Sequence, residues 1–488
     1  MELTPYLLML PVLLPVACGG ALLFSRGWSE RRRNRFSFAA ASLNSLIVLA
    51  LLLWARRESV TFYSFISGFS VDMRIDGMSA VFAALLALMW PPALLYAYEY
   101  MEGESAQGSF FAFYLMTYGV ALGLAFSENL LTMYVFFEML TLVTLPLVTQ
   151  YQDRDSRYAG RLYMVFCVAG ASLGFIAVVM GTLDGGGGFR WGGNLVGTFR
   201  PELMRAVFLL GFFGFGVKAA VFPFYRWLPT ASVAPTPVTA LLHAVAVVNS
   251  GFFAVTRLAW YAFGPELLAG SMTQTLCLAA AAFTMLFAAV MAVRQRHFKR
   301  RLAYSTVSNL SYMLFGTALL SPAGLLGGLA HMVFHGVIKM SMFLCAGAFM
   351  HVTGREYLYE INGCGRKMPL TFGAYTLGAL SLSGVPLLCG FVSKWQLLSA
   401  GLAAGDAAAL AGVAALVLSA FLCAVYTLTV SVRAFFPADG ARGEPAERRE
   451  AGWRMLLPIG MFTALNLLLG VWSGPLMAFL SRIADGGF

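Results

Sequence analysis

Charged residues are scarce in this chain. Only 11% of its 488 residues are Asp, Glu, Lys or Arg, whereas 59% are hydrophobic, and the mean hydropathy is +0.75. A soluble protein needs far more charged surface, and no polar stretch of this sequence is long enough to fold by itself in water. The composition therefore excludes a soluble globular protein and predicts an all-α polytopic membrane protein in a lipid bilayer.

Cysteine is also sparse. The chain has seven cysteines, six of them within apolar runs, and no CxxC pair occurs. This spacing argues against iron–sulfur and zinc sites of the usual kind and implies no disulfide framework.

Apolar runs of spanning length recur from one end of the sequence to the other. The first run lacks a basic segment before it, which favours a retained helix over a cleaved signal peptide. About fourteen transmembrane helices are predicted, at residues 4–24, 37–55, 78–98, 109–126, 129–150, 162–183, 204–228, 237–263, 272–294, 302–320, 323–352, 370–402, 404–436 and 455–481.

The basic residues of the loops lie mainly on one side. The loops after predicted spans 1, 5, 9, 11 and 13 hold twenty of the 33 Lys and Arg residues, and the opposite side holds seven. By the positive-inside rule the richer side is cytoplasmic, so both termini are expected outside a cell inner (plasma) membrane. The net charge of +10 is then a topology signal, and no nucleic-acid partner is expected.

A few ionisable residues lie deep inside the apolar runs. Only five of the basic residues are lysines, yet the three deep cations are Lys218, Lys339 and Lys394, and the one acid clearly at mid-span is Glu138. A buried lysine can release its proton, whereas arginine stays charged. The choice of lysine favours proton loading and release, although a structural role for any single residue stays open. Three arginines are expected nearer the span ends, where they can reach the interface or cap helices: Arg226, Arg257 and Arg433.

The stretch AHMVFHGVIKMSMFLC carries a ladder of three protonatable side chains, His331, His335 and Lys339. Residues spaced by four share one face of a helix, so the ladder is expected to turn towards Lys218 and Lys394. The two histidines could also hold zinc, but no third ligand is evident and Lys339 would repel a metal ion.

Two predicted spans are interrupted close to their lysines. Lys218 lies in GFFGFGVKAAVFPFYRWLP with Pro223, and Lys394 lies in LSLSGVPLLCGFVSKWQLL with Pro386. Broken helices in two halves of a chain are typical of inverted repeats with ion sites near the midplane. Spans 4–8 and spans 9–13 are expected to form the repeats, so the chain divides into residues 1–108, 109–263, 272–436 and 455–488.

The glycine-rich loop DGGGGFRWGG, residues 184–193, has the composition of a phosphate-binding loop. It is predicted outside, between membrane spans and without a preceding strand, so we expect it to be a flexible connector.

Long ordered blocks of the sequence resemble the antiporter-like subunits shared by respiratory complex I, Mrp-type cation/proton antiporters and group 4 membrane-bound hydrogenases. The resemblance covers residues 76–400, most of the chain. The blocks that carry it are ENLLTMYVFFEML, GVKAAVFPFYRWLPTASVAPTPVTALLH, KRRLAYSTVSNLSYM, GLAHMVFHGVIKMSMFLCAGA and GRKMPLT with GVPLLCGFVSKW.

The resemblance implies roles for the deep polar residues. Glu138 and Lys218 correspond to the acid and lysine of one half-channel, the ladder to a central relay, and Lys394 to the terminal lysine. The chain departs from many relatives at Asn249, where a lysine is common, and this leaves His243 as the nearby protonatable group. A second departure is Tyr225, where a histidine is frequent.

The function implied is translocation of protons, or of Na⁺, by one subunit of a redox-driven membrane complex. The resemblance implies that other membrane subunits are partners, and that this chain holds no cofactor and does no catalytic chemistry itself. A subunit of an Mrp-type secondary Na⁺/H⁺ antiporter is the alternative, and a purely structural role is the third possibility.

Overall fold

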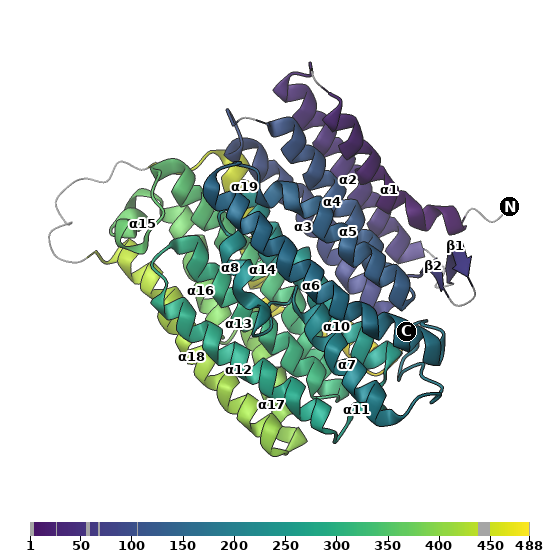
Figure 1. Cartoon of the computed structure of the whole chain (residues 1–488). Coiled ribbons are helices and arrows are strands. Elements are labelled where there is room, and N and C mark those ends of the chain that lie inside the picture. Colours follow the sequence, from purple (N-terminus) through teal and green to yellow (C-terminus); the bar gives the residue numbers. More distant parts are fainter. Residues whose placement is uncertain are drawn as a thin grey trace.

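The computed structural model describes residues 4–25, 27–54, 59–66, 69–104, 106–437 and 449–487. Within these residues the helices lie side by side in one bundle (Figure 1). The first six predicted spans match single helices, namely α1 (Thr4–Leu23), α2 (Glu30–Trp54), α3 (Gly77–Tyr100), α4 (Gln107–Ala125), α5 (Leu130–Val148) and α6 (Arg154–Gly185).

The next two predicted spans are each divided. The seventh consists of α7 (Pro201–Gly216), a short 3-10 turn (Phe224–Arg226) and α8 (Trp227–Ala231), and Pro223 lies in the break. The eighth consists of α9 (Thr236–Ala244), α10 (Val247–Arg257) and a π-helical turn (Leu258–Ala262). The sequence predicted the first division but not the second.

The remaining predicted spans are again helical. The twelfth span is broken as expected, because Pro386 lies in the gap between Ser383, where α16 ends, and Cys389, where α17 begins. The long elements are α12 (Met272–Arg294), α13 (Phe298–Ala318), α14 (Pro322–Thr353), α16 (Pro369–Ser383), α17 (Cys389–Ala404), α18 (Ala407–Phe435), α19 (Trp453–Val471) and α20 (Gly474–Ala484). Short turns lie between them, namely α11 (Pro265–Leu268), a 3-10 turn (Leu358–Ile361) and α15 (Cys364–Lys367).

The chain is a multi-pass helical membrane protein. Ten helical stretches of the described residues, one of them the divided eighth span, are long and apolar enough to cross a bilayer. Several others are halves of broken spans and fall short of that length, so the count of fourteen crossings stays a prediction. One addition to the expected all-α fold is a small hairpin of β1 (Val60–Ile66) and β2 (Phe69–Met73).

Capping side chains set the helix starts near the site. The Asn129 Oδ1 accepts a hydrogen bond from the Thr132 N–H (2.7 Å) and begins α5. The Asp153 carboxylate accepts one from the Ser156 N–H (2.7 Å), so α6 begins several residues before the predicted span. Each cap satisfies a main-chain donor that the first helical turn leaves free.

α14 lies in the middle of the bundle and packs against α9, α13 and α17. Nearly every residue from Gly324 to Met350 is buried, so the helix has no lipid-facing stripe. A helix surrounded in this way holds its polar residues among protein rather than lipid, where intramembrane charges are tolerated.

The glycine-rich loop 184–193 is anchored rather than free. The N–H groups of Arg190 and Gly192 donate to the carbonyls of Tyr261 (2.9 Å) and Trp260 (3.0 Å). The loop therefore closes over the end of the divided eighth span, and the expectation of a flexible connector was wrong.

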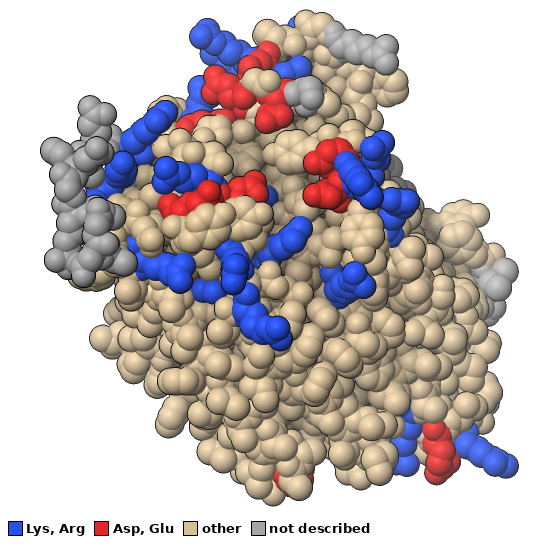
Figure 2. Space-filling model, turned by 60° about the vertical axis from the view of Figure 1, so that its left-hand side comes forward, with Lys and Arg blue, Asp and Glu red and all other residues tan. Residues whose placement is uncertain are grey.

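Charged side chains gather at one end of the molecule, above a broad band without charge (Figure 2). α1 begins and α20 ends near the β-hairpin, whereas α15 lies towards the opposite end (Figure 1).

The predicted orientation rests on loop arginines, and five of these lie outside the described residues: Arg26, Arg56, Arg57, Arg442 and Arg448.

Candidate ion-translocation site

Lys218 lies in the break between α7 and α8 and is fully buried. Its Nζ donates a hydrogen bond to the Phe137 carbonyl of α5 and lies 3.7 Å from the centre of the Phe137 ring. Because the chain leaves the helix at Val217, the lysine can cross to α5 instead of following the axis of α7. The break thus aims Lys218 at the turn of α5 that carries Glu138.

Glu138 follows Phe137 in α5 and is half-buried. Its Oε1 is buried and has no hydrogen-bond partner among the described residues, and no ion pair joins it to Lys218 there. The lysine therefore contacts the main chain one residue away from the carboxylate. The structure brings the two predicted partners to one turn of α5, while their joint function stays a prediction.

The division of the eighth span lies between His243 and Asn249. The His243 ring stacks on Phe343 of α14 at 4.8 Å between ring centres, and neither ring nitrogen has a partner in the described structure. The Asn249 Nδ2 donates to the Ala244 carbonyl at the break (3.1 Å), and its Oδ1 is buried and unpaired among the described residues. The amide of Asn249 and the unpaired imidazole of His243 thus lie on the two sides of this break.

His331, His335 and Lys339 are all buried in α14, at most 1% exposed. The His331 ring is held at both nitrogens, with Nδ1 2.9 Å from Ser393 Oγ on α17 and Nε2 3.2 Å from Asn309 Oδ1 on α13. The hydrogen bonds to two helices fix this imidazole between α13 and α17.

His335 stacks on His331 with 5.9 Å between ring centres, and both of its nitrogens are unpaired among the described residues. One turn further, the Lys339 Nζ donates to the Leu302 carbonyl (2.9 Å) and to Ser305 Oγ (2.7 Å), both on α13. His335, in the middle of the ladder, therefore has no hydrogen bond to its ring among the described residues, whereas His331 and Lys339 at its ends bond to α13.

Lys394, on α17, is the last of the row of buried polar side chains that begins at Glu138. Its Nζ donates to the Leu382 carbonyl of α16 (2.5 Å) and lies 5.2 Å from the centre of the Tyr312 ring. Ser393, the preceding residue, contacts His331. His331, the first residue of the ladder, thus reaches α17 beside Lys394 through one serine, while the orientation of the ladder towards Lys218 stays a prediction.

Four polar side chains along this row keep buried atoms without a partner among the described residues: Glu138, His243, Asn249 and His335. An unsatisfied buried polar atom costs about 1–3 kcal/mol. Buried polar groups of folded proteins usually have a hydrogen-bond partner, so these atoms need one. The row is therefore suited to bind small hydrogen-bonding guests, which include water and the hydrated proton.

Arg257 was expected to reach the interface or cap a helix, and the structure places it elsewhere. The residue does not reach the interface, because it is fully buried and clamps Asp76 with Nη1–Oδ2 at 2.5 Å and Nη2–Oδ1 at 2.7 Å. The buried site by itself raises the pKa of the Asp76 carboxyl, but Arg257 and the Ser79 N–H lower it to about 2. Both residues are predicted at the outer ends of their spans, which is the signal that could have paired them.

Arg74 and Glu128 extend this ion pair towards the hairpin. The Arg74 Nε lies 2.8 Å from the Glu128 carboxylate and its Nη2 lies 3.9 Å from Asp76. Burial raises the pKa of Glu128 to about 7, against the opposing effect of Arg74 and Arg257. We call Asp76, Arg257, Arg74 and Glu128 the outer ion-pair cluster.

Lys299 is a further buried cation that the sequence placed in a loop. It is 4% exposed at the start of α13, and its Nζ donates to the Ala234 carbonyl (2.9 Å). The basic run KRR that begins with this residue gave no sign that the lysine turns inward.

Residues 127–422 match the family model described as NADH:quinone oxidoreductase/Mrp antiporter, TM. The chain is 32% identical to NADH-quinone oxidoreductase subunit N of Desulforudis audaxviator, over 96% of this chain and 95% of that protein. It is 26% identical to a Na(+)/H(+) antiporter subunit of Alkalihalophilus pseudofirmus, over 98% and 96% of the two chains.

The fold is also that of a chain in a solved respiratory assembly. A chain of the membrane-bound sulfane sulfur reductase, an archaeal respiratory membrane complex, superposes with a TM-score of 0.86 at 22% identity, over 98% of this chain and 97% of that one. The region that the family model matches contains every residue of the buried row, so the chain belongs to the NADH:quinone oxidoreductase/Mrp antiporter transmembrane family.

Proposed function

We propose that this chain translocates protons as an antiporter-like subunit of a redox-driven membrane complex. The observation that carries the proposal is the row of buried polar side chains from Glu138 to Lys394, several of which keep buried polar atoms without a partner among the described residues. The relative in NADH-quinone oxidoreductase and the similar chain of a respiratory complex support a redox-driven assembly. In such an assembly, partner subunits carry out the electron transfer.

Water molecules are the ligands that the unpaired polar atoms of the row favour. Successive bases of the ladder are about 6 Å apart along a helix axis, too far for direct hydrogen bonds between them. Waters bonded to His243, His335 and Asn249 would bridge these steps at little cost. Asn249 can hold such a water but cannot carry a proton, which leaves His243 as the protonatable group of the eighth span.

Lys218 has two possible anchors on α5, the Phe137 carbonyl and the Glu138 carboxylate. The structure shows the first. When the lysine turns to Glu138, the ion pair favours its protonated form, and when it turns back, burial favours release of the proton. This exchange would couple a movement of the broken helix to proton loading.

The lysine contacts at the helix breaks favour protons over Na⁺. Sodium would need several oxygen ligands, and the Leu382 carbonyl, at the break between α16 and α17, already accepts a hydrogen bond from Lys394. The alternative function, a subunit of an Mrp-type secondary Na⁺/H⁺ antiporter, draws support from the similarity to the Alkalihalophilus pseudofirmus antiporter.

The test is proton uptake by vesicles that contain the purified membrane complex. Glu138→Gln and Lys218→Ala should each abolish coupled transport while the complex still assembles, whereas Lys367→Ala, at the exposed end of α15, should have no effect. Wild-type transport in both site variants would contradict the proposal. Transport that follows a Na⁺ gradient without any redox substrate would favour the antiporter alternative.

We further propose an inner (plasma) membrane location with both termini outside. The basic loops support this orientation, and so does the gathering of charge at one end of the molecule in Figure 2. A C-terminal reporter fusion that is active in the cytoplasm would refute it.

A further inference from the structure

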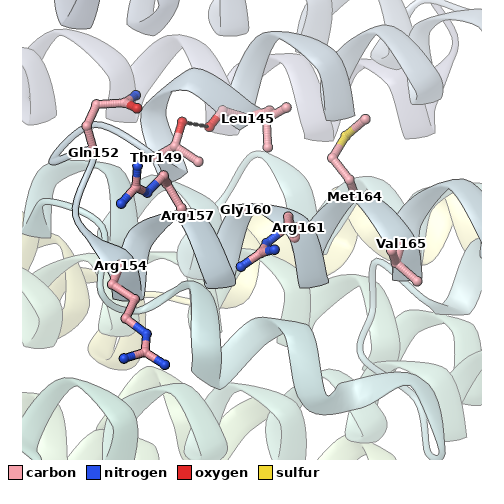
Figure 3. A pocket seen from close by; sticks show the side chains of 9 residues that line it. All are labelled: Leu145, Thr149, Gln152, Arg154, Arg157, Gly160, Arg161, Met164 and Val165. Atoms are coloured by element: carbon pink, nitrogen blue, oxygen red, sulfur yellow. Dashed lines mark hydrogen bonds between the residues drawn. The ribbon is translucent and has the colours of Figure 1, made fainter.

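A cavity of about 750 Å³ lies where α5 turns into α6 (Figure 3). Its walls come from the last turn of α5, the connecting turn and the first three turns of α6. Arg154, Arg157 and Arg161 line one part of it, and Leu145, Met164 and Val165 line another. The cavity is therefore cationic at one end and apolar at the other.

The three arginines of this cavity share one side of α6. Positions separated by three and four residues stack on a helix face, and these three span about 10 Å of the helix axis. None of their guanidinium groups makes a hydrogen bond or an ion pair with any residue that the structure describes. The nearby Asp153 carboxylate is directed to the Ser156 N–H as the cap of α6. Three cations are thus available for an anionic ligand.

The length of α6 places these arginines at the depth of lipid headgroups. The helix has 32 residues, or about 48 Å at 1.5 Å per residue, and exceeds a hydrocarbon core of about 30 Å. The predicted membrane span begins only at residue 162, so the first two turns, which carry the arginines, are expected in the headgroup layer, with Met164 and Val165 where the hydrocarbon begins. Val165 is 65% exposed.

The second cavity lined by several arginines, of about 620 Å³ at the start of α2, is arranged differently. There the Arg32 guanidinium lies 4.3 Å from the centre of the Trp28 ring, so an aromatic side chain already holds one cation. No ring of the described residues covers an arginine of the α5–α6 cavity. The free guanidiniums and the adjoining apolar wall distinguish this cavity from a generic basic loop.

We propose that the α5–α6 cavity binds an anionic phospholipid. The phosphate is held by Arg157 and Arg161, with Arg154 at the rim, because guanidinium groups bind phosphate oxygens in pairs. The acyl chain follows Met164 and Val165 along α6. The Gln152 amide, which lines the same cavity, can donate to the glycerol or phosphate oxygens. Basic pockets between membrane helices recognise such headgroups.

The probe is phosphatidylglycerol at a low fraction in phosphatidylcholine nanodiscs that hold the full chain. Native mass spectrometry counts the phosphatidylglycerol molecules that stay with each chain. The wild type should retain one more than Arg157→Gln/Arg161→Gln, and its affinity should be higher by about fivefold for each arginine. Arg294→Gln/Arg296→Gln, two exposed arginines at the end of α12, is the matched control and should retain the wild-type number.

Equal retention by the wild type and Arg157→Gln/Arg161→Gln would overturn the proposal, and so would equal loss in the control. The single variant Arg161→Gln gives a second reading should the double variant fold poorly. A photo-crosslinker at Gln152 in the native membrane should capture lipid. Capture of an acidic segment of a neighbouring subunit instead would show that a protein fills the cavity, and the lipid assignment would then be wrong.

Discussion

Lys394 joins the two halves of its broken helix by a hydrogen bond from its Nζ to the Leu382 carbonyl, at 2.5 Å. A carbonyl accepts this bond from either the charged or the neutral amine, so the contact survives loss of the proton. Lys218 also binds a carbonyl, but on the neighbouring helix α5. The two broken spans thus hold their lysines in related ways with different partners, and of these two lysines only Lys218 lies next to an acid of the described chain.

Lys339→Arg separates a relay from a structural contact. Arginine keeps the charge but stays protonated, so we expect ion transport to fall by about a hundredfold or more, since proton transfer by a positioned side chain supplies roughly 10²–10⁴-fold. Vesicle proton uptake by the reconstituted complex measures this. Lys367→Arg, at the exposed end of α15, should transport normally. Transport at the wild-type rate by Lys339→Arg would mean that the ladder only packs the bundle.

Length and hydropathy predicted most of the fold, because both are local properties of the sequence. Glycine and proline residues in the spans of Lys218 and Lys394 predicted the two breaks. The division between Ala244 and Val247 has no such residue beside it and arises from packing around α14. The ladder could be predicted since helical spacing alone sets its face.

Partners far apart in the sequence could not be predicted in this way. Arg257 and Asp76 are 181 residues apart, and each alone resembles a common residue near a helix end. Lys299 is hidden among loop arginines and differs from them in its contact with Ala234. Tertiary packing decides which of several similar charges becomes buried.

The Arg257–Asp76 pair should be strongly coupled. Removing one partner leaves the other charge buried, so Arg257→Leu should lower the free energy of unfolding by about 3–5 kcal/mol. Asp76→Asn keeps the helix-cap oxygen and should also destabilise the protein, while the double variant should lose less than the sum of the two. Unfolding in detergent micelles gives the four values. Arg433→Leu is the exposed control, and strictly additive losses would exclude the coupling.

Glu128 should make stability depend on pH near neutrality. Its pKa is raised to about 7, above the 4.5 expected when unfolded, so the folded state holds the proton more tightly. The free energy of unfolding should therefore be highest below about pH 4.5 and fall on the order of 3 kcal/mol as the pH rises to about 7. The charged groups that face this carboxyl are Arg74, Arg257, Asp76 and Asp72.

Glu128→Gln isolates this effect, since the amide keeps the size of the side chain and cannot titrate. The difference in unfolding free energy between wild type and Glu128→Gln, measured in detergent from pH 4.5 to 7.5, should grow steadily in favour of the variant. Because the lowered pKa of Asp76 lies near 2, that group contributes no slope in this range. Glu102→Gln, at an exposed position, should run parallel to the wild type. A constant difference for Glu128→Gln would show that Arg74 keeps the carboxylate ionised throughout, and the outer ion-pair cluster would then be a fixed structural clamp rather than a pH-sensitive one.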